Sequence, residues 1–292
     1  MVEAMEAVLG DACLLPARAR LALERLEKAR AALATCEICL HRCSVNRLAG
    51  PAGRCGADAE PHVFSAQVEV GDEWELIPAY AIALAGCNMR CSFCITGDES
   101  WHPQRGHWLD AVTVAGRAAA AIESGRARSL LVLGGEPTIH LPWLLKLVAS
   151  MPDKAHLVLK TNGLSSAPAR EILADLFDVW VVDFKFGCDA CAAELSRTPG
   201  YTAAVCETLL WAAEHTDLII RHLLLPGHVE CCWRPAAEWI ASRLPLAKVS
   251  LRAGYWPSWR AVNQAPLNRP LASGELSAAT EIARSLNLRL VP

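Results

Sequence analysis

The chain has 292 residues, of which 53% are hydrophobic and 20% are charged. Its 28 Lys and Arg residues nearly balance 31 Asp and Glu residues, which gives a formal net charge of −3. Because the sequence contains no long basic tract, the composition argues against a general nucleic-acid surface. Every apolar run is shorter than the roughly 18 residues that a membrane helix needs, so the composition predicts a large core and no membrane span.

The first six residues, Met1-Val2-Glu3-Ala4-Met5-Glu6, are acidic. They lack the basic region and apolar stretch of a secretion signal. The 13 cysteines are therefore expected in a reducing compartment, where thiols bind metals or stay free. We expect the protein in the cytoplasm.

The first predicted element is a helix over Ala17–Thr35, in which Leu23, Leu26 and Leu33 form an apolar stripe. Its basic residues favour a solvated helix docked on the rest of the protein over a nucleic-acid contact. Three parts are expected along the chain: an N-terminal helical segment over 1–35, a cysteine-rich metal-binding module over 36–75, and a catalytic domain over 76–292.

The cysteine-rich module has the pattern Cys-x2-Cys-x3-Cys-x11-Cys, formed by Cys36, Cys39, Cys43 and Cys55. So small a glycine-rich segment cannot bury enough apolar surface to fold without a cross-link. Four thiols can provide that cross-link by binding a metal. Four cysteines suit structural Zn²⁺ and a [4Fe–4S] cluster equally well, so the pattern leaves the metal open.

A second cysteine motif, Cys-x3-Cys-x2-Cys, places Cys87, Cys91 and Cys94 directly after the apolar run Tyr80–Ala85. Thiolates normally hold all four irons of a [4Fe–4S] cluster. Three closely spaced cysteines can hold three of the irons and leave the fourth open to a small molecule. A zinc site usually recruits ligand pairs from separate loops, so this triplet fits zinc less well.

This triplet resembles the signature of the radical S-adenosylmethionine (radical SAM) enzymes, and Phe93 matches the aromatic or apolar residue that precedes their last cysteine. The resemblance implies that S-adenosylmethionine (SAM) binds the open iron through its amino and carboxylate groups. It also implies that one electron cleaves the cofactor to a 5′-deoxyadenosyl radical, which abstracts hydrogen from a substrate. Phe93 is then expected to lie at the cofactor.

Leu130–Leu133 followed by Gly134-Gly135-Glu136-Pro137 predicts a buried parallel strand that ends at a tight loop. Glycines allow close backbone approach to a ligand, and Glu136 can accept hydrogen bonds from an ammonium group. The motif matches the family's Gly-Gly-Glu, which holds the amino group of SAM. The resemblance therefore implies that Gly134, Gly135, Glu136 and Pro137 bind the cofactor.

Further apolar runs at 155–159, 179–182, 219–220 and 248–251 alternate with helix-compatible stretches at 112–124, 141–150, 167–176, 201–215, 235–243 and 275–286. This alternation predicts an α/β fold with a parallel sheet, in which polar residues at the strand ends share one site. Six units are too few for a closed barrel of eight. They suit the partial (β/α)6 TIM-like barrel that the resemblance implies, preceded by the small helical and cysteine-rich parts.

Within the superfamily, the chain resembles pyruvate formate-lyase activating enzymes and their uncharacterised relatives with an N-terminal four-cysteine motif. The resemblance rests on Thr161-Asn162-Gly163, on Asp183-Phe184-Lys185, and on Arg221 through Pro226-Gly227-His228. It implies cofactor-binding roles for Thr161, Asn162 and Asp183, and catalytic roles for Lys185, Arg221 and His228.

The leading functional hypothesis is an activase-like oxidoreductase that uses a [4Fe–4S] cluster and SAM to abstract hydrogen from a protein or peptide backbone. An electron donor such as flavodoxin or ferredoxin is then an expected partner. The alternatives are a biosynthetic enzyme that acts on a small metabolite, and a non-catalytic iron–sulfur electron carrier or scaffold. The intact Gly-Gly-Glu argues against the last, because an electron carrier needs no cofactor cradle.

Cys188-x2-Cys191 and the pair Cys231-Cys232 belong to neither motif. They could form a further cluster or a redox relay near the site. Buried thiols acting as small hydrophobes are the favoured interpretation.

Overall fold

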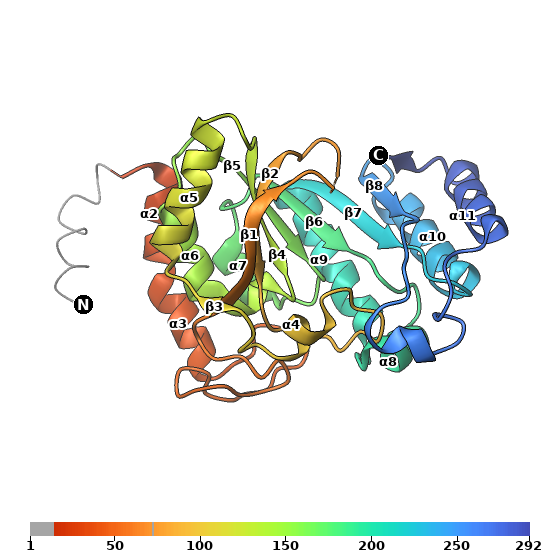
Figure 1. The fold of residues 1–292 in the computed structure, drawn as a ribbon, viewed down its shortest axis with the longest axis horizontal. Helices are drawn as coiled ribbons and strands as arrows, with labels where there is room; N and C mark the ends of the chain where they lie inside the picture. Colours follow the sequence, from red (N-terminus) through yellow and green to blue (C-terminus); the bar gives the residue numbers. More distant parts are fainter. Residues whose placement is uncertain (1–14, 72) are drawn as a thin grey trace.

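A computed structural model describes residues 15–71 and 73–292 (Figure 1). The acidic start of the chain and the first part of the predicted segment 1–35 lie outside the described residues. The helices are α2 (Ala17–Glu24), α3 (Leu26–Ala34), α4 (Gly97–Trp101), α5 (Ala111–Glu123), η2 (Pro137–His140), α6 (Leu141–Ala149), α7 (Ala167–Leu173), α8 (Asp189–Ser196), α9 (Tyr201–His215), η3 (Val229–Trp233), α10 (Arg234–Arg243), η4 (Trp259–Asn263) and α11 (Ser273–Ser285). The strands are β1 (His62–Glu69), β2 (Ala79–Leu84), β3 (His107–Trp108), β4 (Ser129–Gly134), β5 (His156–Thr161), β6 (Val179–Asp183), β7 (Asp217–Leu223), β8 (Lys248–Arg252) and β9 (Arg289–Leu290).

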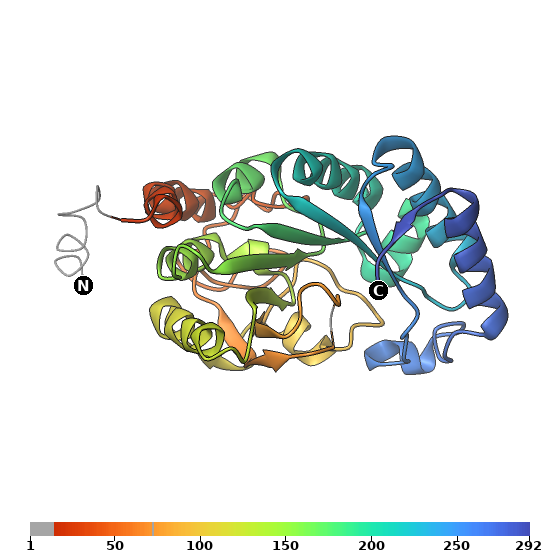
Figure 2. The same ribbon diagram turned by 90° about the horizontal axis from the view of Figure 1, so that it is seen from above.

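The strands form one curved sheet in the order β3-β1-β2-β4-β5-β6-β7-β8-β9. From β2 to β9 all neighbours are parallel, whereas β1 pairs antiparallel with both β2 and β3. The helices cover the outer face of the sheet, and its two edges stay apart (Figure 2). The predicted α/β fold with an open, partial barrel is confirmed.

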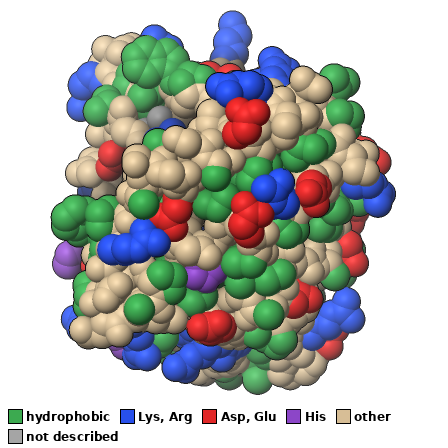
Figure 3. Space-filling model, turned by 90° about the vertical axis from the view of Figure 1, so that its right-hand side faces the viewer, with side chains coloured by type: hydrophobic (Ala, Val, Ile, Leu, Met, Phe, Trp, Pro, Cys, Tyr) green, Lys and Arg blue, Asp and Glu red, His purple; other side chains and the backbone are tan. Residues whose placement is uncertain are grey.

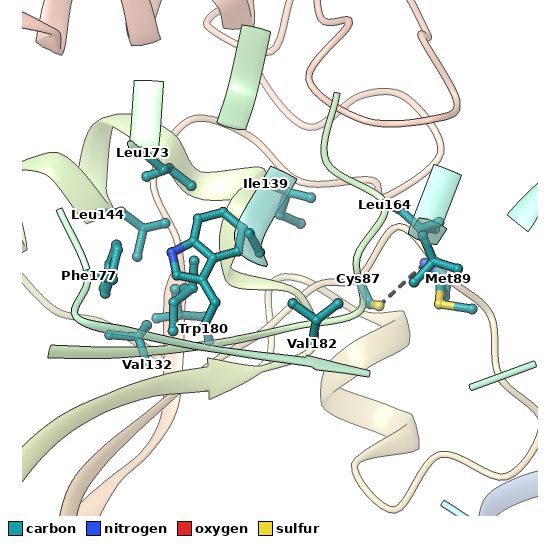
Figure 4. Packing of buried hydrophobic residues seen from close by; sticks show 14 of the residues in the cluster. Cys87, Met89, Val132, Ile139, Leu144, Leu164, Leu173, Phe177, Trp180 and Val182 are labelled. Carbon is teal, nitrogen blue, oxygen red and sulfur yellow. Dashed lines mark hydrogen bonds between the residues drawn. The ribbon is translucent and has the colours of Figure 1, made fainter. Parts of the chain in front are cut away.

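Each central parallel strand is buried on both faces, because side chains alternate along a strand. The outer face packs against the helices. In Figure 4, Trp180 of β6 lies among Leu144, Leu173 and Phe177. The inner face carries a second apolar cluster, which fills the barrel toward the amino ends of the strands: Leu76, Ala79, Ala81, Leu131, Val158, Val179, Val181 and Ile219.

The predicted single helix over Ala17–Thr35 is wrong in one respect, since the helix is interrupted at Arg25. The Arg25 guanidinium donates to the carbonyl oxygens of Ile172 and Ala174, at the C-terminal end of α7. Two short helices, α2 and α3, therefore pack beside α6 and α7 in place of one straight helix (Figure 1).

The cysteine-rich segment docks on the barrel through buried polar contacts. Arg47, which is 1% exposed, donates to the carbonyl oxygens of Ala57 at 2.9 Å, Asp58 at 2.6 Å and Ile139 at 2.8 Å. One guanidinium thus ties the segment to itself and to η2. The strand β1 also falls within residues 36–75, and it pairs with β2 of the barrel.

The face around α10 and α11 carries mixed charges (Figure 3). Several of these charges are paired there, as in Arg269–Glu275 and Arg284–Glu281, both at 2.7 Å. Among the described residues, no helix is long and apolar enough to cross a membrane.

Candidate active site

A cavity of about 470 Å³ opens at the carboxyl ends of the parallel strands. Its walls come from the cysteine loop after β2, the glycine loop after β4, and the ends of β5, β6 and β7. Of the residues predicted as functional, those that line it are Cys87, Cys91, Phe93, Cys94, Gly134, Gly135, Thr161, Asn162, Asp183, Lys185 and Arg221. The structure therefore brings most of the predicted site together.

The two glycines of the Gly-Gly-Glu loop are required by close backbone packing. Gly134 has φ +126°, and a Cβ atom there would lie 2.3 Å from the Leu84 nitrogen. A Cβ atom on Gly135 would lie 2.0 Å from the Gly86 oxygen and 3.3 Å from Cβ of Cys87. The Gly135 N–H donates to the Leu84 carbonyl at 2.8 Å, so the pairing of β4 with β2 continues to the start of the cysteine loop. These glycines position Cys87.

The three cysteines fit a metal cluster by their chemistry and by their shared cavity. Two N–H groups point at Cys87 Sγ, from Met89 N at 3.3 Å (Figure 4) and from Asn162 Nδ2 at 3.6 Å. Such N–H donors favour a thiolate over a thiol. Burial raises the pKa of Cys87 well above its usual value and that of Cys91 to about 12. Inside this cavity, thiolates therefore need a cation beside them.

Glu136 lies behind the cavity wall rather than on it. Its carboxylate is fully buried and accepts hydrogen bonds from four donors: Thr138 N at 3.1 Å, Thr138 Oγ1 at 2.7 Å, Thr161 Oγ1 at 2.8 Å and Asn162 N at 2.7 Å. Burial raises the pKa of Glu136, and the bonds from Asn162, Thr138 and Thr161 partly offset this. The carboxylate thus holds Thr161 and Asn162, which do line the cavity.

Charged side chains face the cavity in compensating groups. Lys185 pairs with Asp183 at the end of β6. Although burial alone would raise it, Lys185 and Arg221 hold the pKa of the Asp183 carboxyl below its usual value. Asp183 is therefore an anion at neutral pH, able to accept hydrogen bonds from a bound ligand.

The sequence reasoning missed Glu73, a fully buried carboxylate near the cavity. It contacts three strands: Lys160 Nζ at 3.3 Å on β5, Arg221 Nε at 3.2 Å on β7, and Ser250 Oγ at 3.0 Å on β8. It lies in the acidic stretch Gly71-Asp72-Glu73-Trp74-Glu75, which predicts an exposed loop, so no local signal could have found it.

Besides Glu136, two residues predicted for the catalytic site, Pro137 and His228, lie away from the cavity lining. Pro137 is buried at the first position of η2, where its fixed φ suits a helix start. His228 follows the loop after β7. Its Nδ1–H donates to the Pro226 carbonyl at 2.7 Å, and its ring lies near Cys191 and Cys231.

Asn88 lies between the two predicted cysteine sites and was not singled out from the sequence. Its side chain is next to the Cys39 thiol, and its Oδ1 accepts from Asn162 Nδ2 at 2.7 Å. The Asn88 carbonyl is 2.8 Å from Nε2 of His41. Cys39 and His41 of the N-terminal cysteine segment therefore contact the loop that carries Cys87.

Three of the four N-terminal cysteines are buried, and Cys43 is half-buried. Burial raises the pKa of Cys39 to about 11, with Cys55 and Cys36 near enough to add to the shift. The Arg54 N–H is 3.3 Å from Cys43 Sγ. This donor set fits a thiolate-bound metal, and the identity of that metal stays a prediction.

Known proteins resemble this chain in sequence. A sequence model of the radical SAM superfamily matches residues 82–240. An uncharacterized protein of Methanocaldococcus jannaschii is 28% identical over 275 residues, which cover 91% of this chain and 79% of that protein. A 7-carboxy-7-deazaguanine synthase of Neisseria meningitidis is 32% identical over 101 residues, which cover 34% of this chain and 42% of that enzyme.

Solved structures share the fold. SuiB of Streptococcus suis bound to S-adenosylmethionine matches with a TM-score of 0.52 and 16% identity, over 70% of this chain and 47% of that one. A radical SAM methyltransferase of Sphaerobacter thermophilus matches with a TM-score of 0.54 and 19% identity, over 72% and 65%. The chain thus spans about half of the first structure and two thirds of the second. At these identities the likeness concerns the fold alone.

Proposed function

The chain belongs to the radical SAM superfamily, and from this premise we propose that it is an activase-like oxidoreductase that abstracts hydrogen from a protein or peptide backbone. Cys87, Cys91 and Cys94 would hold a [4Fe–4S] cluster. When bound and reduced, such a cluster supplies the electron that cleaves SAM to methionine and a 5′-deoxyadenosyl radical.

The protein's own part is to hold SAM and exclude water. Backbone groups of Gly134 and Gly135, together with Thr161 and Asn162, would bind the methionine part of the cofactor, and Glu136 would fix the latter two from behind. Asp183 would accept a hydrogen bond from the cofactor. The Lys185 ammonium and the Arg221 guanidinium would meet carbonyl oxygens of the substrate.

Exposed apolar side chains at the mouth of the cavity support a peptide substrate. Ile95 and Trp256 line it, yet they are 79% and 72% exposed. Large apolar side chains at the rim of a functional cavity are typical of a binding surface. A cavity of about 470 Å³ is the size that holds one drug-sized ligand, which SAM would fill. A substrate must then approach from the rim, as an extended segment can.

A small metabolite is the second candidate. Its support is a pair of short sequence matches, one to the 7-carboxy-7-deazaguanine synthase and one to a GTP 3′,8-cyclase of Acidothermus cellulolyticus that is 37% identical over 83 residues. The matches cover only 34% and 26% of this chain.

The electron donor would be a small redox protein such as flavodoxin or ferredoxin, with the cytoplasm as the place of the reaction.

The test measures where the abstracted hydrogen comes from. Reconstituted, reduced protein is incubated with SAM and peptides that carry α-deuterated glycine, and deuterium in 5′-deoxyadenosine is read by mass spectrometry. We expect deuterium transfer with the wild type and none with a Cys87, Cys91 and Cys94 triple Ala variant. Deuterium transfer to 5′-deoxyadenosine from deuterated small metabolites, and none from the peptides, would favour the metabolite candidate. Wild type that forms no 5′-deoxyadenosine at all would leave the scaffold hypothesis standing.

A further inference from the structure

Four cysteines outside the catalytic cavity converge beyond the ends of β6 and β7. Cys188 and Cys191 begin α8, while Cys231 and Cys232 lie in the π-turn η3. The sulfur atoms of Cys188, Cys191 and Cys232 all lie within 4.8 Å of one another. The Cys191 and Cys231 sulfur atoms are 3.6 Å apart, and those of Cys231 and Cys232 are 4.0 Å apart. Of the six sulfur–sulfur pairs, five are therefore close.

The backbone is arranged to bring these segments together. A Cβ atom on Gly187 would lie 2.2 Å from the Cys232 oxygen, so only glycine allows this approach. The turn η3 has π geometry, which is rare and is frequently found at functional sites. It places two consecutive cysteines against α8. Cys188 caps α8, and the Cys191 N–H points at its sulfur from 3.5 Å. An N–H donor of this kind stabilises a thiolate.

We propose that Cys188, Cys191, Cys231 and Cys232 hold one Zn²⁺ ion. Zn–S bonds of about 2.3 Å in a tetrahedron place neighbouring sulfur atoms about 3.8 Å apart. The distances of 3.6 and 4.0 Å agree with that edge length. Four thiolates are also one of the usual donor sets of structural zinc.

His228 is the neighbour of this site rather than one of its four ligands. One of its ring nitrogens lies within 4.8 Å of the Cys191 and Cys231 sulfur atoms. Its Nδ1–H is used by the Pro226 carbonyl, which orients the ring. Four cysteine ligands would fill all four positions of a zinc site, so we assign His228 to the surroundings that shape the site.

The proposed ion would cross-link the loops that carry cavity residues. Asp183 and Lys185 precede Cys188 on the β6 loop, and Arg221 precedes Cys231 on the β7 side. Both segments contribute to the cavity at the strand ends. The zinc would hold them in place without taking part in the reaction, and the proposal is independent of the substrate.

The test uses the full chain, purified without oxygen after growth with zinc, and counts zinc and iron per chain by mass spectrometry. Cys191→Ser should remove about one zinc, because it deletes a ligand of a four-coordinate site, and should leave the iron content unchanged. Cys206→Ser is the matched control, since Cys206 lies half-buried on α9 and outside this cluster. It should change neither metal. His228→Gln should keep the zinc.

Thermal unfolding gives a second measurement that does not depend on activity. Cys191→Ser should lower the midpoint, and zinc added after chelation should raise the midpoint of the wild type by more than that of the variant. Zinc content that is equal in Cys191→Ser and wild type would overturn the proposal. Loss of zinc in His228→Gln but not in Cys188→Ser would overturn the assignment of the four ligands.

Discussion

Asn162 contacts both Glu136 and Cys87. Its main-chain N–H donates to Oε2 of Glu136 at 2.7 Å, and its side-chain Nδ2 is 3.6 Å from Cys87 Sγ. One residue at the end of β5 therefore connects the Gly-Gly-Glu loop to the cysteine loop. A substitution that displaces one of these loops should therefore also displace the other.

Replacing Cys87, Cys91 and Cys94 with Ala should abolish the electron paramagnetic resonance signal that responds to SAM. These three thiols are the ligands proposed for the catalytic cluster, and the signal would respond to SAM through the open iron of that cluster. The measurement compares spectra of reduced protein with and without SAM. A signal that still shifts on adding SAM to the triple variant would refute the assignment.

Gly135→Ala should prevent assembly of the catalytic cluster. The new Cβ would lie 2.0 Å from the Gly86 oxygen, so the cysteine loop must move. Iron analysis should show about four fewer Fe per chain, as expected for one cluster. Gly116→Ala is the control, because Gly116 is exposed in α5 with nothing within 4 Å of its Cβ position. It should keep its iron and gain up to about 1 kcal/mol of stability.

Glu136→Ala should weaken both the fold and cofactor binding. The change leaves four buried donors without an acceptor, at about 1–3 kcal/mol for each group that stays unpaired. We expect the free energy of unfolding in urea to fall by roughly 3 kcal/mol or more. SAM affinity should fall about tenfold to a hundredfold, which is about 1.4–3 kcal/mol.

The control for this variant is Glu281→Ala, whose carboxylate is 67% exposed and pairs with Arg284. Removal of a surface pair of this kind should change stability by less than about 1 kcal/mol. Unfolding curves and SAM affinities that are alike for the two variants would mean that Glu136 has no special role.

The N-terminal cysteines should hold a metal of their own. In the triple Ala variant, metal analysis should still find about one Zn or about four Fe per chain in addition to the zinc proposed at Cys191. Adding Cys39→Ser should remove that metal. Native protein whose Cys36, Cys39, Cys43 and Cys55 all react readily with an alkylating reagent would contradict the prediction.

Glu275 should make stability depend on acid pH. Its carboxylate accepts from Arg269 and from the Gly227 and Ala272 N–H groups, with Arg269 the main cause of a pKa lowered from 4.5 to about 2. Because the pKa of Glu275 is lower in the folded protein than in the unfolded chain, the ionised carboxylate stabilises the folded state at any pH above the unfolded-state pKa. This stability is complete above about pH 4.5 and is lost as the pH falls toward 2. In Glu275→Gln, the stability difference from wild type should shrink over that range, as measured by urea unfolding at each pH.

The six central strands could be predicted because they contain apolar runs, and the most buried of them, such as β4 with Leu130–Leu133, are the clearest. The strand β1 was missed for the opposite reason. It is only partly buried and contains Gln67 and Glu69, so no run marks it. The strands β3 and β9 have two residues each and owe their form to their neighbours.

The candidate site was predictable where chemistry follows local spacing, as in Cys87, Cys91 and Cys94. It was not predictable where burial depends on distant strands. Glu73 shows this, since its partners lie 87, 148 and 177 positions further along the chain. The cluster around Cys191 likewise depends on a contact between two loops that only the fold brings together.

Leu76 and the inward-facing side chains beside it fill the barrel below the cavity. Among the described residues, the cavity therefore has its entrance at the carboxyl ends of the strands. SAM and the peptide must then enter through the same opening, and the reactant that binds deeper in the cavity must enter first. Turnover should follow a compulsory order, with SAM before the peptide, and steady-state kinetics with a dead-end peptide should show inhibition that excess SAM cannot relieve.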